Sequence, residues 1–225
     1  MGTLSGKSVG IIHAAVFTAQ VVEKFFKEII PSVKTYHLGD DTIQETNLSA
    51  PIGTIPKDNF FKFATYARFL EEAGVDLILL GCSTFNQAVE HARPMISVPL
   101  LQIDRPMMDE AVKVGTRVGL LATLPSTVPS SERLLRLAAV EAGKDISIKT
   151  ILNSEAFKEL RAGNADRHNA MLLESIDILS REVDVIVMAQ VSMTALEPML
   201  QKTKVPVFNS GRTSVNRIKQ MLQLG

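Results

Sequence analysis

The chain has 225 residues, and its 24 basic and 24 acidic side chains leave a formal charge of zero at neutral pH. With 46% hydrophobic residues and no basic cluster, it has the composition of a globular protein that does not bind nucleic acid. One cysteine excludes an internal disulfide, and no signal peptide or apolar run of roughly 18 residues is present, so a cytoplasmic location without membrane contact is expected.

The first half alternates short apolar runs with helical patterns. VGIIHA (9–14) is the first predicted strand, and an amphipathic helix follows over 19–31, where it ends at a proline. A second helix over 60–74 ends at a glycine, a residue type common just past helix C-termini. VDLILLGCST (75–84) and VPLLQID (98–104) are predicted strands, because continuous Val, Ile and Leu runs suit parallel strands covered on both faces.

The second half has the same layout. VGLLAT (118–123) is a predicted strand, and helices follow over 130–143, with a serine as its N-cap, and over 167–183. VDVIVMAQVS (183–192) and VPVFNSG (205–211) are the last two apolar runs. They match the corresponding runs of the first half at offsets of 107 to 109 residues, as does 118–123. This nearly constant offset indicates a duplicated half.

Strands alternating with helices predict an α/β protein with two similar lobes on parallel sheets. We assign residues 1–104 to the first lobe and 105–207 to the second. The C-terminal segment 208–225, with the helical pattern TSVNRIKQMLQL, is expected to pack back onto the first lobe.

Open parallel sheets bind ligands beyond the carboxyl ends of their strands. In the first half this position holds His13 and the segment from Cys82 to Thr84, and in the second it holds Thr123–Thr127 and Gln190–Ser192. If the lobes face each other, Cys82 and Gln190 lie opposite across one cleft. His13 is either a second base there or a structural histidine.

The residue types at these strand ends indicate a site for a small carboxylic acid. A thiol followed by a helix lies near free backbone N–H groups, which lower its pKa and make it an acid, base or nucleophile. Ser83 and Thr84 supply hydroxyls on one side of the cleft, and Thr123, Ser126 and Thr127 supply them on the other. No cluster has the spacing of metal ligands, so no metal is predicted.

The segments GCST (81–84), ATLPST (122–127) and AQVSM (189–193) resemble the aspartate/glutamate/hydantoin racemase superfamily, and the resemblance covers essentially the whole chain. It implies two Rossmann-like lobes related by pseudo-twofold symmetry, with the active site between them. It also implies a homodimer that works without pyridoxal phosphate, metal or other cofactor. In such enzymes one cysteine removes a proton next to the substrate carboxylate, and a second cysteine returns a proton from the far side.

Carried onto this sequence, the first cysteine is Cys82, but Gln190 stands at the second position. Glutamine does not exchange a proton near neutral pH, so racemisation by the usual pair lacks one partner. Gln190 is then either an amide that orients the substrate or a position held by internal hydrogen bonds. The resemblance also places substrate contacts at seven residues on both sides of the cleft: Ser83, Thr84, Thr123, Ser126, Thr127, Val191 and Ser192.

Three functions remain open. The first is an isomerase or racemase acting next to the carboxylate of a small amino acid or derivative, with Cys82 as the acid/base and His13 as a surrogate partner. The second is a lyase that protonates its product from one face, as the related arylmalonate decarboxylases do with a single cysteine; cis–trans isomerisation by thiol addition is a variant. The third is a carboxylate binder without catalysis. The whole-chain resemblance favours the first.

Overall fold

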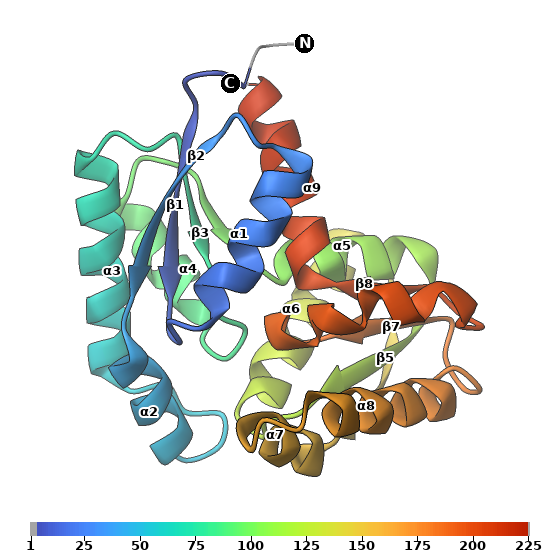
Figure 1. Cartoon of the computed structure of the whole chain (residues 1–225). Coiled ribbons are helices and arrows are strands. Elements are labelled where there is room, and N and C mark those ends of the chain that lie inside the picture. The colour runs from blue at the N-terminus through green and yellow to red at the C-terminus, as the bar shows by residue number, and fades with distance from the viewer. Residues whose placement is uncertain (1–3, 225) are drawn as a thin grey trace.

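A computed structural model describes residues 4–224 as two α/β lobes, each built on a four-stranded parallel sheet (Figure 1). The first sheet, in the order β2-β1-β3-β4, consists of β1 (Ser8–His13), β2 (Lys34–Gly39), β3 (Leu77–Leu80) and β4 (Leu100–Gln102). The second, in the order β6-β5-β7-β8, consists of β5 (Arg117–Ala122), β6 (Ser147–Leu152), β7 (Val185–Met188) and β8 (Val207–Asn209). The repeated strand order confirms the predicted pair of similar lobes.

Helices cover both faces of each sheet. The first half contains α1 (Thr18–Ile29), α2 (Asp41–Ser49), α3 (Lys57–Glu72), α4 (Gln87–Ala92) and the 3₁₀ helix η1 (Arg93–Met95). The second half contains α5 (Arg105–Val114), α6 (Thr127–Glu141), α7 (Ser154–Arg161), α8 (Ala165–Leu179), the 3₁₀ helix η2 (Val191–Lys202) and the final helix α9 (Ser210–Leu224).

The glycines correctly mark two helix ends, whereas other predicted bounds are wrong: the helix expected over 167–183 ends at Leu179, and α3 and α6 begin three residues before their predicted starts. α3 and α6 are each followed within two residues by a glycine with positive φ, Gly74 at 79° and Gly143 at 64°. The serine expected to cap 130–143 instead lies inside α6, which begins at Thr127 without a side-chain cap. Ser130 and Ser131 are buried there. The helix starts earlier because its first turn packs at the junction with the first lobe, which the local sequence does not reveal.

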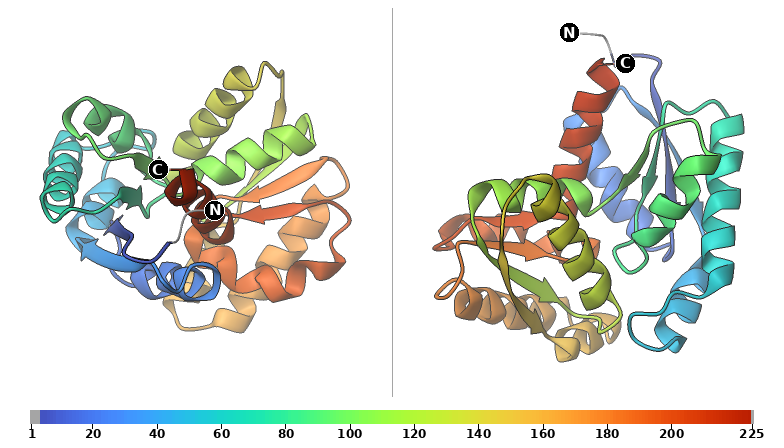
Figure 2. Two further views of the ribbon diagram at one scale, coloured as in Figure 1. Left: turned by 90° about the horizontal axis from the view of Figure 1, so that it is seen from above. Right: turned by 180° about the vertical axis from the view of Figure 1, so that it is seen from behind.

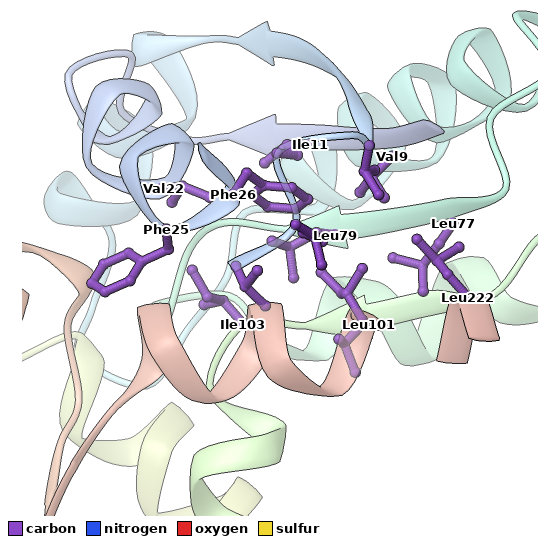
Figure 3. Close-up of a cluster of buried hydrophobic side chains, with 14 of the residues drawn as sticks. Val9, Ile11, Val22, Phe25, Phe26, Leu77, Leu79, Leu101, Ile103 and Leu222 are labelled. Atoms are coloured by element: carbon purple, nitrogen blue, oxygen red, sulfur yellow. The ribbon is translucent and has the colours of Figure 1, made fainter. Parts of the chain in front are cut away.

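The strand pattern explains the two cores of the first lobe. Successive strand residues point to opposite faces, so Leu77 and Leu79 of β3 pack with α1 and α9, whereas Ile78 and Leu80 pack with α3 and α4. Figure 3 shows the first of these clusters, with Leu222 of α9 close to Leu77. In the second lobe, β7 divides its side chains in the same way between α5 and α6 on one face and α8 and η2 on the other.

Helix α9 lies at the junction of the two lobes and contacts both α1 and α5 (Figure 2). Its buried residues Val215, Ile218 and Leu222 belong to the core of the first sheet. The lobe boundary at residue 104 stays a prediction, and residues 1–3 and 225 of the predicted ranges lie outside the described part of the chain. Within residues 4–224, the helices are too short or too polar to cross a membrane.

Candidate active site

A small cavity of about 50 Å³ lies between the lobes, where the carboxyl ends of the central strands meet. Both halves of the chain line it: Ala15, Phe17, Thr18, Gln44 and Gly81–Thr84 come from the first half, and Leu124, Thr127, Phe157 and Gln190–Ser192 from the second. Seven of the predicted site residues are thereby brought together. Three others, His13, Thr123 and Ser126, are not among the residues that line this cavity.

Cys82 is the second residue after the end of β3 and is partly exposed. Gly81 precedes it, and a Cβ at that position would lie 3.1 Å from Nδ1 of His13, so a side chain there would crowd the histidine ring. Burial raises the pKa of the Cys82 thiol to about 11, although backbone hydrogen bonds from Thr84 and Phe85 oppose this shift.

The predicted low pKa of this thiol is therefore wrong for this structure. The reason is partly the position of the helix, because α4 begins only at Gln87, five residues after Cys82. Its N-terminal N–H groups lie too far along the chain to stabilise a thiolate, since the effect of a helix end falls off within one turn. The Asp104 carboxylate adds a further unfavourable charge for the thiolate.

Asp104 anchors the loop that carries the thiol. Its carboxylate is fully buried and accepts hydrogen bonds from Ser83 Oγ at 3.0 Å and from Asn86 Nδ2 at 3.2 Å. Burial raises the pKa of Asp104 to about 6, and these two hydrogen bonds partly offset the rise. The carboxylate makes no cap bond to α5. Since the hydroxyl proton of Ser83 is used in this bond, Ser83 can contact a substrate only as an acceptor, through its lone pairs.

Two hydrogen bonds from Thr123 fix the side chain of Gln190. Its Oε1 accepts a 2.6 Å hydrogen bond from the Thr123 backbone N–H and a 2.8 Å bond from the Thr123 hydroxyl. A backbone N–H can only donate, so the side-chain atom facing it must be the amide oxygen. The amide nitrogen, with its two donors, is then the polar group that Gln190 has left for the cavity it lines. A substrate-orienting amide and an internally hydrogen-bonded Gln190 are therefore compatible hypotheses, because the internal hydrogen bonds fix the orientation of the amide.

Two hydroxyls join the lobes. Thr84 Oγ1 and Thr127 Oγ1 lie 3.2 Å apart, one from each half of the chain. Ser126, one residue earlier, faces a separate small cavity shared with Thr84, and its buried Oγ has no hydrogen-bond partner among the described residues. The hydroxyls of Ser126 and Thr127, predicted on the same side of the cleft, thus face two neighbouring cavities.

His13 lies behind the cavity wall and is not among the residues that line it. Its side chain is 1% exposed, and both ring nitrogens are engaged: Nδ1 with Thr18 Oγ1 at 2.9 Å and Nε2 with Nδ1 of His37, also at 2.9 Å. Burial, reinforced by the neighbouring His37, lowers the pKa of His13 to about 4. The surrogate-base role of His13 stays a prediction, and in this structure both of its ring nitrogens already have hydrogen-bond partners.

Sequence reasoning missed several residues that line the cavity, notably Phe17, Thr18, Gln44 and Phe157. They lie on helices or loops that pack over the strand ends, and no local motif marks them. Among residues 4–224, no three His, Cys, Asp or Glu side chains come together in a group able to hold a metal ion.

The sequence of this chain matches that of known proteins. A family model described as Asp/Glu/Hydantoin racemase matches residues 11–218. The chain belongs to this family. The glutamate racemase of Trichodesmium erythraeum (strain IMS101) is 24% identical over 201 residues, which cover 87% of this chain and 70% of that protein.

Solved structures of other proteins have the same fold. An aspartate racemase homologue from Pyrococcus horikoshii OT3 superposes with a TM-score of 0.73 at 17% identity, over 96% of this chain and 99% of that one. The allantoin racemase from Klebsiella pneumoniae gives a TM-score of 0.72 at 16% identity, over 98% and 89% of the two chains. Both comparisons confirm the predicted two-lobed architecture of the superfamily.

Proposed function

We propose that the protein is a cofactor-independent isomerase of the racemase type, which moves a proton at the carbon next to the carboxylate of a small acid or its derivative. Cys82 is the acid/base, and Gln190 donates hydrogen bonds from the opposite wall. The observation that carries this proposal is the cavity between the lobes, where Cys82 is the one ionisable side chain among the described lining residues. Membership of a racemase family supports the reaction type.

The neutral walls of the cavity constrain the substrate. Hydroxyls and amides surround the thiol, and neither a cation nor a carboxylate lines the space among the described residues. A substrate carboxylate would be held by hydrogen-bond donors such as the Gln190 amide, not by an ion pair. A cavity of about 50 Å³ is far smaller than the roughly 300 Å³ or more of ligand pockets, so the lobes or covering loops must open to admit a substrate.

The similar proteins carry the names of different substrates, glutamate and allantoin, so the test must cover several substrate classes. The homodimer and the cytoplasmic location stay predictions. The test is proton exchange in deuterated water, followed by NMR on single enantiomers of aspartate, glutamate and substituted hydantoins. We expect loss of the signal from the carbon-bound proton that depends on Cys82, and its absence in Cys82→Ser.

A one-face lyase is the second candidate, and the state of the thiol favours it. With a pKa of about 11, Cys82 is protonated at neutral pH and is ready to give a proton to a carbanion. Such an enzyme would break a carbon–carboxylate bond, release CO₂ and protonate the remaining carbanion from the Cys82 side. Disubstituted malonates in deuterated water would then yield one labelled enantiomer, whereas a racemic product would refute one-face protonation.

The two candidates and a non-catalytic binder are distinguishable. If the carbon-bound proton exchanges for deuterium while the substrate keeps its configuration, proton transfer occurs on one face alone. If the rate of this exchange equals the rate of racemisation, a second proton donor acts on the opposite face. If neither exchange nor decarboxylation occurs while small carboxylates raise the melting temperature, the binder is correct. Gln190→Ala serves as the matched variant, because it removes the proposed donors and leaves the thiol in place.

A further inference from the structure

A chain of hydrogen bonds leads from the wall of the cavity to the protein surface. It starts at Thr18, which lines the cavity, and passes through His13 and His37 to Glu23. The successive donor–acceptor distances are 2.9, 2.9 and 3.2 Å. The two imidazole planes lie 12° apart, so the N–H···N bond between the rings is close to planar.

The direction of these bonds follows from the fixed acceptor at the inner end. The Thr18 hydroxyl lies 2.7 Å from the carbonyl oxygen of Ala15, which can only accept, so the hydroxyl proton belongs to that bond. His13 Nδ1 must then donate to Thr18. Since burial lowers the pKa of His13 to about 4, this ring is neutral near pH 7 and its Nε2 carries a lone pair.

The outer half of the chain runs from His37 to Glu23. His37 Nδ1 must donate to the lone pair of His13 Nε2, and His37 Nε2 faces an oxygen of Glu23. Burial favours a protonated Glu23, but hydrogen bonds from Thr35 and His37 outweigh it and lower the pKa of that carboxyl. Lys27 approaches the other oxygen of Glu23 at 3.5 Å.

We infer that Thr18 is a specificity-determining residue, whose hydroxyl is held by the His13–His37–Glu23 chain as a hydrogen-bond acceptor toward the cavity. Its proton points to Ala15 and one lone pair takes the His13 proton, so a ligand meets only the second lone pair. The matching ligand group is an N–H or O–H donor. If the cavity binds substrate as proposed above, Thr18 offers a hydrogen-bond acceptor on one wall, and Gln190 offers hydrogen-bond donors on the opposite wall.

The protonation states can be measured without any substrate. In the full chain labelled with ¹⁵N-histidine, NMR at pH 7 should show neutral His13 with its proton on Nδ1. Glu23→Gln, which changes the outer partner of His37, should shift the ¹⁵N signals of His37. Lys27→Gln, which affects the other oxygen of the same carboxylate, should leave both rings unchanged. A His13 proton on Nε2 in the wild-type protein would overturn the inference.

The acceptor role of Thr18 is tested with two reagents that alkylate Cys82. Iodoacetamide carries N–H donors, and iodoacetate carries only acceptors at the same position. Thr18→Val should lower the ratio of their rates by about fivefold, the effect of one hydrogen bond, whereas Thr18→Ser should preserve it. An unchanged ratio in Thr18→Val would show that Thr18 does not accept a hydrogen bond from the ligand. Because alkylation requires no turnover, the test is valid even if the protein has no catalytic activity.

Discussion

Lowering the pH from 7 to 5 should cost the protein about 2 kcal/mol of unfolding free energy through His13 alone. An unfolded histidine has a pKa near 6.5, whereas burial lowers the pKa of folded His13 to about 4. Above pH 6.5 the ring is neutral in both states, and its stability contribution is fully present. As the pH falls from 6.5 toward 4, the unfolded chain takes up the proton first, so this contribution is lost, reaching about 3 kcal/mol in total.

The assay is urea unfolding of the wild-type protein and His13→Gln at pH 7, 6 and 5 and constant ionic strength. Glutamine keeps a donor and an acceptor but does not titrate, so the variant should lose about 2 kcal/mol less between pH 7 and 5. Asp104 acts with the opposite sign, because its raised pKa favours the folded state as the pH falls, but it is present in both proteins and cancels. Equal losses would refute the assignment of a neutral, buried His13.

Three further predictions concern the site and the junction of the lobes. Alkylation of Cys82 followed against pH should show a midpoint near 11, and Asp104→Asn should move it down, because the Asp104 charge disfavours the thiolate; a midpoint near 8.5 would mean an unburied thiol. Gln190→Met should lower the unfolding free energy by about 1–3 kcal/mol in urea titrations, since it leaves the buried Thr123 N–H without its acceptor, and no loss would show that water replaces the amide. Gly211→Ala should cost about 1–3 kcal/mol by the same measurement, because the added Cβ would lie 2.5 Å from the Phe25 ring; an unaffected variant would mean that this ring can move.

Much of the architecture followed from the pattern of residues along the chain. The apolar runs of β1, β3, β5 and β7 are continuous because both faces of these central strands are buried, and their repetition at a constant offset indicated the duplicated lobe. The glycines after α3 and α6 correctly marked helix ends, because a positive φ is a local requirement. Family membership was likewise predicted from short motifs at the strand ends.

The failures concern properties that depend on distant neighbours. The pKa of Cys82 was predicted from the segment that follows it, but burial between the lobes and the charge of Asp104 determine it. His13 was placed correctly at a strand end, yet its role depends on His37, which reaches it from the neighbouring strand β2. Thr18, Gln44 and Phe157 had no motif, because they enter the site from helices packed over it.

By itself, the sequence determined the two-lobed α/β fold, its family and the presence of one thiol opposite one glutamine, because these follow from residue types and their spacing. Only the tertiary structure decided which nitrogens and oxygens remain free for a ligand. Thr18 donates to the Ala15 carbonyl and accepts from His13 within one turn of the chain, whereas the Gln190 amide oxygen accepts from Thr123, which is far away in the sequence. Burial then shifts the pKa of each group, because the surrounding protein excludes water and thereby disfavours the charged form.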